Sequence, residues 1–244
     1  MKTLLDSQPW QVVDDDRVVY SVADSHQQRE QAFRLVYQNY ARKGLVPPAE
    51  GELRVTPWHL RGSTNVFVAQ RATEVICTVS LIGDSDLGLP MESIFSQEVA
   101  HERQNGRVAE VSSLAMADIS MTAFLPTFME ILRLLTQHAR YHGVDKLLVA
   151  AHPRHARYYE RCMGYVRIGN ERTYPSVRNA PAVASCLDFA KADRERPAFY
   201  DKVFGQPLSA WELRSCPMPV LQIAYFQQYC GQDSLLNNIL EQMV

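Results

Sequence analysis

Hydrophobic residues recur with two different periods along this chain, and the period indicates where strands and helices lie. Short stretches that alternate between apolar and polar residues, or that are rich in β-branched residues, predict strands at residues 17–23, 64–70, 74–82, 107–116, 146–151, 165–173 and 182–189. Apolar residues three or four positions apart predict helices at residues 26–42, 92–104, 122–142, 152–164 and 191–203, with one or two more at 219–243. The strand, helix and strand between residues 107 and 151 form one βαβ unit, so the pattern predicts an α/β fold.

One predicted strand carries a carboxylate between apolar neighbours. The segment Arg107–Met116 reads RVAEVSSLAM, and both of its alternating faces are mostly apolar, which is typical of a strand that is covered on two sides. Strict alternation places Glu110, Ser112 and Leu114 on one face. Burial raises the pKa of a carboxyl group and makes it a proton acceptor near neutral pH, unless a nearby cation or hydrogen-bond donor keeps it ionised. Glu110 is therefore either a general base or a structural carboxylate paired with an arginine.

A long loop at residues 44–63 follows the first predicted helix and is rich in proline and glycine. Loops of this kind beside a core often form the walls of binding sites. Arg54 or Arg61 would hold a substrate carboxylate through a bidentate contact, and Trp58 and His59 would line the same pocket. Surface charge and loop packing are the alternative roles for each of these four residues.

Composition and charge restrict the partners of the protein. The 244 residues are 46% hydrophobic, and 25 basic against 27 acidic residues give a formal net charge of −2. A general electrostatic attraction to nucleic acid or to an anionic membrane is therefore not indicated. We expect no signal peptide, and no segment approaches the ~20 apolar residues of a membrane span. We expect a flexible tail at 1–16, one large domain at 17–190 and a helical C-terminal extension at 191–244.

Cysteine and histidine spacings favour neither disulfides nor a metal centre. The five cysteines are scattered, odd in number and without a close CxxC pair, which is typical of reduced thiols in a cytoplasmic protein. His138 and His142 are four residues apart, but no glutamate follows His138 and no third ligand is evident, so we predict no metal site. No Gly-x-Ser-x-Gly motif or Cys/His pair supports covalent catalysis.

Several segments, in order, resemble a known family of acyltransferases. Residues 152–169, HPRHARYYERCMGYVRIG, look like the last helix-strand signature of the GCN5-related N-acetyltransferase (GNAT) fold. The further matching segments are AFRLVYQNY at 32–40, LRVTPWH at 53–59, NVFVA at 65–69, DLGLP at 86–90 and AEVSSLA at 109–115. Together they are most similar to the long-chain N-acyl amino acid synthases, the FeeM-like group, which are related to the acyl-homoserine-lactone synthases. The resemblance implies a central twisted mixed sheet flanked by helices. It also implies transfer of a long fatty acyl group from an acyl-carrier-protein thioester to the α-amine of an amino acid.

The resemblance also implies roles for residues of the 107–116 strand. Related enzymes carry a Glu-x-Ser-Arg pattern there, which Glu110 and Ser112 match, whereas Ser113 stands where arginine is usual. Glu110 would accept the amine proton, and Ser112 would orient the base or the carbonyl, unless it is a small core hydroxyl bonded to the backbone. A backbone N–H near Ser112 or Leu114 would bind the thioester oxygen.

Two further elements take roles from the same resemblance. Tyr159 aligns with the tyrosine that many acetyltransferases of this fold use as a general acid toward the thiolate, and Tyr158 is its neighbour; a packing role is the alternative. The first helix borders the acceptor pocket in similar proteins. Arg34 and Tyr40 are therefore candidates for contacts with the amino acid substrate.

The acyl donor is indicated by a missing motif and by local charge. Acetyltransferases that use coenzyme A place a glycine-rich loop before the helix that follows the Glu110 strand, but residues 117–126 contain no glycine and include Asp118. A phosphopantetheine arm of a carrier protein fits better than a coenzyme A thioester, and no permanently bound cofactor is expected. Residues 152–178 hold six arginines and two glutamates, so we expect an acidic carrier to dock there. The docking candidates are Arg154, Arg157 and Arg161; a solvated helix face is the alternative.

Two other functions stay open at this point. The first is an acyl-coenzyme A-dependent N-acyltransferase, which would bind free coenzyme A productively. The second is a non-catalytic module that binds an acyl group or an acyl carrier, for which loss of the Glu110 carboxylate would change nothing. A lactone synthase is disfavoured by the long C-terminal extension and by Ser113.

Overall fold

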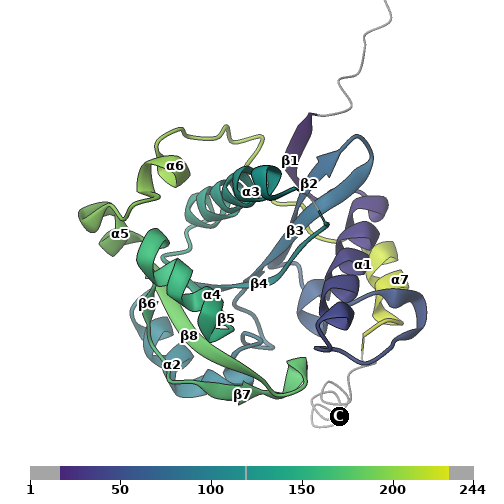
Figure 1. Cartoon of the computed structure of the whole chain (residues 1–244), viewed down its shortest axis with the longest axis horizontal. Helices are drawn as coiled ribbons and strands as arrows, with labels where there is room; N and C mark the ends of the chain where they lie inside the picture. Colours follow the sequence, from purple (N-terminus) through teal and green to yellow (C-terminus); the bar gives the residue numbers. More distant parts are fainter. Residues whose placement is uncertain (1–16, 119, 231–244) are drawn as a thin grey trace, which may run out of the picture.

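The computed structural model describes residues 17–118 and 120–230, so the predicted tail at 1–16 and the part of the predicted C-terminal helices beyond 230 lie outside the described residues. A mixed sheet with the strand order β1-β2-β3-β4-β5-β8-β6 forms its centre, and β7 pairs with β8 off this path (Figure 1). The strands are β1 (Val18–Val22), β2 (Thr64–Arg71), β3 (Glu74–Gly83), β4 (Val108–Met116), β5 (Lys146–Ala151), β6 (Val166–Arg167), β7 (Arg172–Tyr174) and β8 (Ala180–Asp188). Among the described strands only β4 and β5 pair in parallel, as expected for the two strands of a βαβ unit.

The helices lie largely where the apolar spacing predicts them. They are α1 (His26–Arg42), α2 (Glu92–Gln104), α3 (Met121–Tyr141), α4 (Pro153–Tyr158), α5 (Phe189–Glu195), α6 (Tyr200–Phe204) and α7 (Val220–Gln227). A capping box fixes the start of α1, in which the Ser25 hydroxyl accepts from the Gln28 N–H and the Gln28 side chain accepts from the Ser25 N–H. The predicted α/β fold with helices flanking a central mixed sheet is confirmed.

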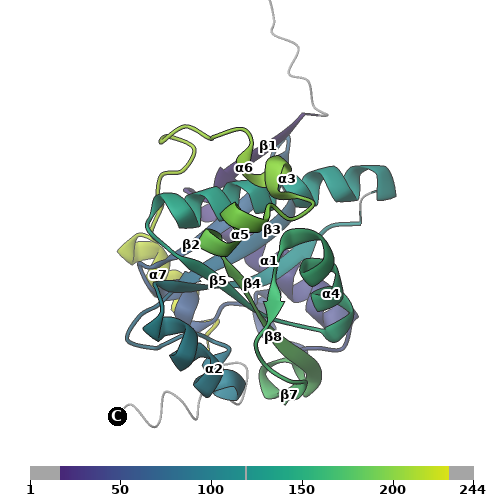
Figure 2. The same ribbon diagram turned by 90° about the vertical axis from the view of Figure 1, so that its left-hand side faces the viewer.

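Helices cover both faces of the sheet (Figures 1 and 2). On one face, α3 packs Ile131 and Leu135 against Phe67 in a cluster that also includes residues from α5 and α6. On the other face, α1 packs Phe33 against Phe226 of α7, with ring centroids 5.1 Å apart, and α2 forms a separate apolar cluster. The sheet is thus apolar on both sides, which explains its nearly continuous hydrophobic strands.

Three predicted elements differ from the structure. The predicted strand at 165–173 is two short strands, β6 and β7. The predicted helix at 191–203 is split into α5 and α6, because Arg196 has a φ of 43° and Pro197 follows it. The long loop at 44–63 contains two 3₁₀ turns, Glu50–Glu52 and Pro57–Leu60.

Two irregularities in β4 shape the centre of the molecule. The parallel pairing of β4 with β5 ends at Glu110 opposite Leu148, so the two strands separate beyond this point. A β-bulge follows, because Ser80 pairs with Ser112 whereas Thr78 pairs with Ala115, and Ser113 has a φ of 54°. The extra residue reverses the alternation of side chains. Leu114 therefore packs against the α3-side cluster and does not share a face with Glu110, which corrects the prediction from strict alternation.

Candidate active site

A cavity of about 980 Å³ lies where β4 and β5 separate, and it reaches both faces of the sheet. On the α1 side its walls are mostly polar or aromatic, and include Tyr40, Arg54, Thr56, Trp58, Ser93, Glu110, Ser112, Tyr174 and Ser176. On the α3 side they are mostly apolar, and include Val111, Leu114, Phe124, Phe128, Leu132, Val149 and Met163. One space thus joins a polar chamber to an apolar one through the gap in the sheet.

Glu110 is the buried carboxylate of the polar chamber. Its side chain is 2% exposed, and its Oε2 accepts a hydrogen bond of 2.8 Å from the backbone N–H of Met91. Burial raises the pKa of Glu110 to about 8, with a further contribution from the charge of Glu92, while the Met91 N–H partly opposes the shift. Within residues 17–118 and 120–230 no cation forms an ion pair with Glu110, so the arginine-paired alternative finds no support there. Such a carboxylate is suited to accept a proton near neutral pH.

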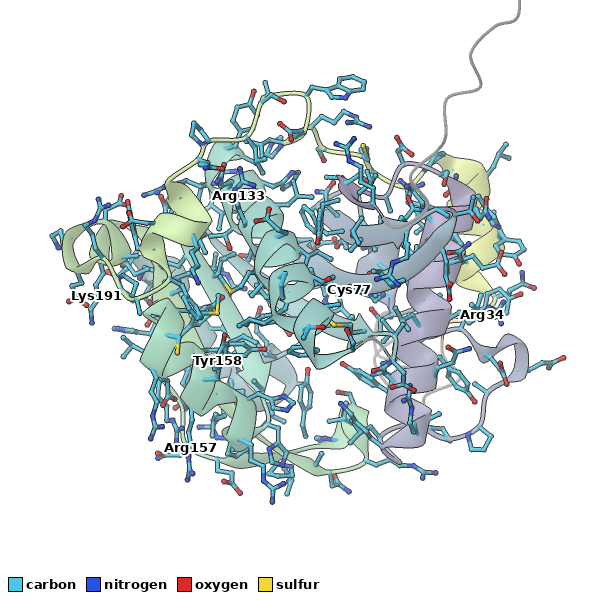
Figure 3. All side chains as sticks on the ribbon, turned by 45° about the horizontal axis from the view of Figure 1, so that its top comes forward. Arg34, Cys77, Arg133, Arg157, Tyr158 and Lys191 are labelled. Atoms are coloured by element: carbon cyan, nitrogen blue, oxygen red, sulfur yellow. The ribbon has the colours of Figure 1, made fainter. Side chains whose placement is uncertain are left out.

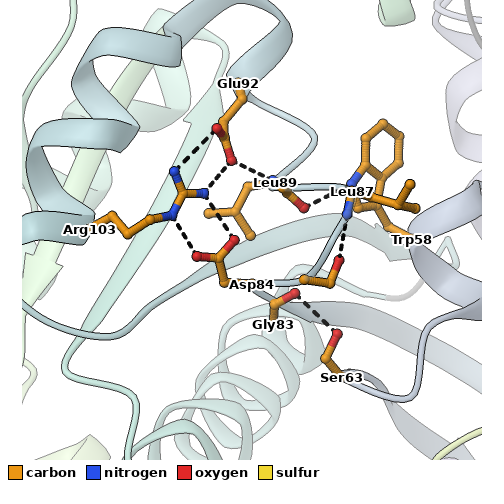
Figure 4. A network of polar contacts seen from close by, with 10 residues as sticks. Trp58, Ser63, Gly83, Asp84, Leu87, Leu89, Glu92 and Arg103 are labelled. Atoms are coloured by element: carbon orange, nitrogen blue, oxygen red, sulfur yellow. Dashed lines mark hydrogen bonds and ion pairs between the residues drawn. The ribbon is translucent and has the colours of Figure 1, made fainter. Parts of the chain in front are cut away.

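A network of polar contacts ties down the loop that leads to Met91, whose N–H donates to Glu110. Figure 4 shows the part of this network formed by Asp84, Glu92 and Arg103. Arg103 of α2 bonds both oxygens of Asp84, at 2.6 and 2.9 Å, and also contacts the carboxylate of Glu92. Glu92 in turn accepts from the Leu89 N–H at 2.7 Å, two residues before Met91. The loop between β3 and α2 is therefore tied to the helix that begins directly after Met91.

Trp58 is anchored to the same loop. Its indole Nε1 donates to the Gly88 carbonyl at 3.1 Å, and its ring lines the cavity as predicted (Figure 4). Gly88 has a φ of 63°, a conformation that glycine adopts without strain. Both the cavity wall and the hydrogen-bond donor to Glu110 thus depend on the conformation of residues 84–91.

Tyr158 ends α4, Tyr159 begins the π-helical segment Tyr159–Met163, and the two side chains have different surroundings. Tyr159 lines the cavity, and burial, followed by the neighbouring Tyr40 and Tyr158, raises its pKa to about 12. Tyr158 packs between Phe128 and Phe199, with ring centroids 6.2 and 6.0 Å away, and its buried hydroxyl has no hydrogen-bond partner among the described residues. Of the two, Tyr159 is placed to donate a proton inside the cavity.

Arg54 and Tyr40 form a cationic corner of the polar chamber. The Arg54 guanidinium lies 5.0 Å above the centre of the Tyr40 ring and donates to the Ser176 carbonyl at 3.1 Å. Both residues line the cavity, as does Ser112, which is partly exposed. Arg54 places a positive charge in the same chamber as Glu110.

Three predicted pocket residues lie outside the cavity lining. Arg34 bonds Glu30 at 2.8 Å and the Gly51 carbonyl at 3.2 Å, and Figure 3 shows it on α1, at the opposite side of the molecule from Arg157. Arg61 pairs with Asp86 at 3.1 Å. Neither arginine lines the cavity, and each forms an ion pair with a neighbouring carboxylate, so their contact with the substrate stays a prediction.

His59 is also absent from the lining and is buried instead. It is 2% exposed; its Nδ1 accepts from the Thr56 N–H at 3.0 Å, and its Nε2 lies 3.2 Å from the Ser80 hydroxyl. Burial lowers its pKa to about 3, so the ring is neutral. His59 therefore contributes to the site indirectly, by fixing Thr56, which lines the cavity.

Several lining residues carry no sequence signal of their own. Tyr174, from β7, lines the same cavity as Glu110, and its pKa is raised by burial and then by the charge of that carboxylate. Lys43 ends α1, and His155 lies in α4. All three come from segments distant in sequence that meet only in the folded protein. The basic composition around His155 is the one hint that the sequence offers.

The arginines of residues 152–178 divide into paired and unpaired groups. Arg167 bonds Glu160 at 3.0 Å, and Arg172 pairs with Glu98. Arg154, Arg157 and Arg161 are exposed, and the described part of the chain offers none of them an ion-pair partner. Arg154 lines the cavity, whereas Arg157 lies at the edge of the molecule in Figure 3.

Two searches of the described residues bear on other kinds of site. Residues 17–118 and 120–230 bring together no group of three or more His, Cys, Asp or Glu side chains that could hold a metal ion. His138 and His142 have ring centroids 4.3 Å apart, and His142 bonds the Leu213 carbonyl at 2.8 Å. No helix in this part of the chain combines the length and the apolar character needed to cross a bilayer.

Comparisons with known proteins point to one family. The family model of the N-acyl amino acid synthase FeeM matches residues 31–188. The solved structure of FeeM, an N-acyl amino acid synthase from uncultured soil microbes, gives a TM-score of 0.61 at 26% identity, over 72% of this chain and 94% of that one. No curated protein sequence matches the chain.

Two less similar structures share the fold. The acyl-homoserine-lactone synthase LasI gives a TM-score of 0.57 at 15% identity, over 79% of this chain and 96% of that one. The aminoglycoside acetyltransferase AAC(6′)-Ib, solved in complex with coenzyme A and kanamycin, gives 0.51 at 16% identity, over 74% of this chain and 99% of that one.

Proposed function

Because the chain belongs to the FeeM family of N-acyl amino acid synthases and is thus an N-acyltransferase, we propose that it transfers a long-chain fatty acyl group from an acyl carrier protein to the α-amine of an amino acid. The predicted family and GNAT-like fold are confirmed. One observation carries the proposal for the substrates. The cavity joins an apolar chamber to a polar chamber that holds a buried carboxylate, and the junction lies where two strands separate.

The apolar chamber suits the acyl chain. Phe124 and Phe128 stack with ring centroids 6.1 Å apart, and Leu132 continues the apolar wall along α3. Burial of each methylene group of a fatty chain contributes about 0.8 kcal/mol to binding, so an apolar wall of this kind favours long chains. The pantetheine arm is narrow enough to enter between the separated ends of β4 and β5 and to place its thioester at the junction.

The polar chamber suits the amino acid. Arg54 carries the charge that the substrate carboxylate needs, and Glu110 faces the same space. An α-amine arrives as an ammonium ion, which must lose a proton before it can attack. Transfer of that proton to Glu110 converts a buried ion pair into two neutral groups, and the raised pKa of the carboxyl group favours this transfer.

The chemistry then proceeds by aminolysis. The neutral amine attacks the thioester carbonyl, the C–N bond forms, and negative charge develops on the carbonyl oxygen. A backbone N–H of the bulge at Ser112–Leu114 would stabilise this charge, because β4 has no strand partner on the β5 side there. The C–S bond breaks, and Tyr159 protonates the leaving thiolate, while the second amine proton restores the tyrosine. Ser112 would orient the carbonyl from the adjacent wall.

Two features favour a carrier protein as the donor. The start of α3 lacks glycine, and Asp118 precedes it, so a coenzyme A diphosphate would meet a carboxylate in place of a backbone cradle. Arg154, Arg157 and Arg161 are exposed and have no ion-pair partner among the described residues, and Arg154 lines the cavity. Their positive charge suits a carrier protein, because carrier proteins are acidic.

The direct test offers the protein matched acyl-carrier-protein and acyl-coenzyme A donors of graded chain length, together with the twenty amino acids, and identifies products by mass spectrometry. We expect an N-acyl amino acid, formed with kcat/KM about tenfold or more higher from the carrier donor, because docking charges act only on the protein partner. Absence of any N-acyl product would refute the proposed function. A preference for coenzyme A would refute the donor.

A second measurement tests the docking surface alone. Charge reversal in Arg157→Glu/Arg161→Glu should raise KM for the acyl carrier about tenfold at low salt and less at high salt. The matched control is reversal of Arg194, an exposed arginine of α5. Equal KM values for the double variant and the control would show that Arg157 and Arg161 are not part of the docking surface.

A further inference from the structure

Basic side chains lie at the exposed end of the cavity lining, which is its mouth, whereas Glu110 lies at the buried, inner end. Lys43 follows the last turn of α1, and Arg154 and His155 lie in the first turn of α4. All three are exposed, and all three line the same cavity whose inner end holds the 2%-exposed Glu110. His152 lies beside them, with its ring centroid 6.0 Å from that of His155. Two elements far apart in sequence therefore contribute positive charge to one opening.

No described carboxylate neutralises the charge of Lys43 or Arg154. Lys43 and Arg154 form no ion pair with any residue that the structure describes. Asp118, which also lines the cavity, is engaged by Arg42, whose Nη1 lies 2.8 Å from both of its carboxylate oxygens. Although His155 is exposed by its surface area, partial desolvation lowers its pKa, and the charges of Lys43 and His152 lower it further, so the three side chains lie close enough to interact.

The usual anion position of this fold is poorly equipped in this chain. At the start of α3 the Ser120 hydroxyl already accepts from the Ala123 N–H at 3.3 Å, and residues 117–126 contain no glycine that would let an anion approach the backbone. Asp118 adds negative charge there. An anionic donor entering this cavity must therefore find its positive partner in side chains.

We propose that Lys43, Arg154 and His155 form a phosphate site at the mouth of the cavity, which holds the phosphate of the donor's pantetheine arm while the thioester reaches Glu110. This inference rests on the proposed function and specifies which residues bind the donor. The site is separate from the outer arginines, Arg157 and Arg161, which would face the carrier protein itself. A lysine and an arginine suit a phosphodiester because each forms charge-assisted hydrogen bonds with its oxygens.

The test compares two protein-free donors that differ only in the phosphate, a fatty acyl pantetheine and the same acyl 4′-phosphopantetheine. In the wild type, the phosphate should raise kcat/KM about tenfold or more. In Lys43→Ala/Arg154→Ala this ratio should fall to about threefold or less, and Arg154→Lys should retain most of it because it keeps the charge. Removal of the exposed Arg194, with the same change in charge per site, should leave the ratio as in the wild type.

Binding of 4′-phosphopantetheine itself, measured by calorimetry, provides a readout that does not depend on turnover. We expect weaker binding in the double variant and unchanged binding in Arg194→Ala. A wild-type ratio near one, or a ratio that the double variant preserves, would overturn the phosphate site. A coenzyme A donor more than tenfold better than acyl 4′-phosphopantetheine would overturn its assignment to a pantetheine arm alone. If no donor, including the acyl carrier protein, yields product, the proposed function fails instead.

Discussion

The inner end and the mouth of the cavity differ in the sign and in the burial of their charged side chains. At the inner end a single carboxylate, Glu110, is buried with one backbone N–H as its partner, and burial raises its pKa to about 8. At the mouth, Lys43 and Arg154 stand exposed, and no described carboxylate pairs with either. Desolvation therefore determines the pKa of the group at the inner end. Exposed positive charge determines the electrostatic potential at the mouth.

This difference indicates that the two ends of the cavity have different functions. A buried group with a perturbed pKa is useful for moving a proton, but its field is of little use to attract a distant partner. Exposed cations attract an anionic donor over a distance, through a field that salt screens. Changes at the inner end should therefore affect the chemical step, and changes at the mouth should affect donor binding.

The largest expected effect is the loss of the Glu110 base. Glu110→Gln keeps the shape and the acceptor for the Met91 N–H but cannot take a proton, so kcat should fall about 10²- to 10⁴-fold. Circular dichroism and donor binding should stay as in the wild type, which separates loss of chemistry from loss of fold. Full acyltransferase activity in the variant would show that Glu110 is not the base.

The second effect concerns the adjacent tyrosines Tyr158 and Tyr159, at the end of α4 and directly after it. Tyr159→Phe removes the hydroxyl that lines the cavity, and kcat should fall about 10- to 100-fold because the thiolate leaves unprotonated. Tyr158→Phe is the matched control, since the Tyr158 hydroxyl is buried without a partner among the described residues. Donors with a more acidic thiol should partly restore the Tyr159→Phe rate. Equal rates for the two variants would contradict the assignment.

The third effect is the pH dependence that the Glu110 carboxyl group imposes. Its pKa of about 8 in the folded protein means that kcat/KM should rise about tenfold per pH unit below 8 and then level off. The amine of the substrate contributes to the same profile, so stability provides an independent measurement.

The sign of the stability effect follows from proton binding. The folded pKa is above the ordinary value of 4.5, so the folded state binds more protons between these values, and stability is lost as the pH rises through the window from 4.5 to about 8. One pKa unit corresponds to about 1.4 kcal/mol. The free energy of unfolding of Glu110→Gln, relative to that of the wild type, should therefore rise by a few kcal/mol between pH 5 and pH 9. If the free energies of unfolding of the two proteins differ by the same amount at every pH in that range, the pKa of Glu110 is not raised.

The sequence predicts much of this fold because hydrophobic period is a local property. The alternation in β2 and β3 and the apolar spacing in α3 appear directly in the chain, and so does the misplaced Glu110. The bulge at Ser113 was missed because one extra residue in β4 changes which side Leu114 faces without changing composition. Contacts between residues distant in sequence are equally invisible in the chain, which is why the pairing of Arg61 with Asp86 and the position of Arg34 outside the cavity lining could not be predicted.

The smallest expected effect tests how the inner end is held. Arg103 does not touch the cavity, but it binds Asp84 and Glu92, and Glu92 fixes the Leu89 N–H close to Met91 (Figure 4). In Arg103→Met the loop loosens, the Met91 hydrogen bond weakens and Glu92 loses its counter-ion. Both of the last changes raise the pKa of Glu110 further. We expect kcat/KM at pH 7 to fall about three- to tenfold and its pH profile to shift to higher pH.

The control must lose a similar ion pair elsewhere. Arg140 of α3 pairs with Asp193 of α5, far along the chain from the Glu110 network, so Arg140→Met should cost stability without moving the pH profile. Arg103→Lys should restore part of the rate, because it keeps one charge between the two carboxylates but lacks the fork that bonds both. If Arg103→Met and Arg140→Met lower thermal stability alike and leave the same pH profile, Arg103 stabilises the fold only, and Glu110 owes its pKa to burial without help from the loop.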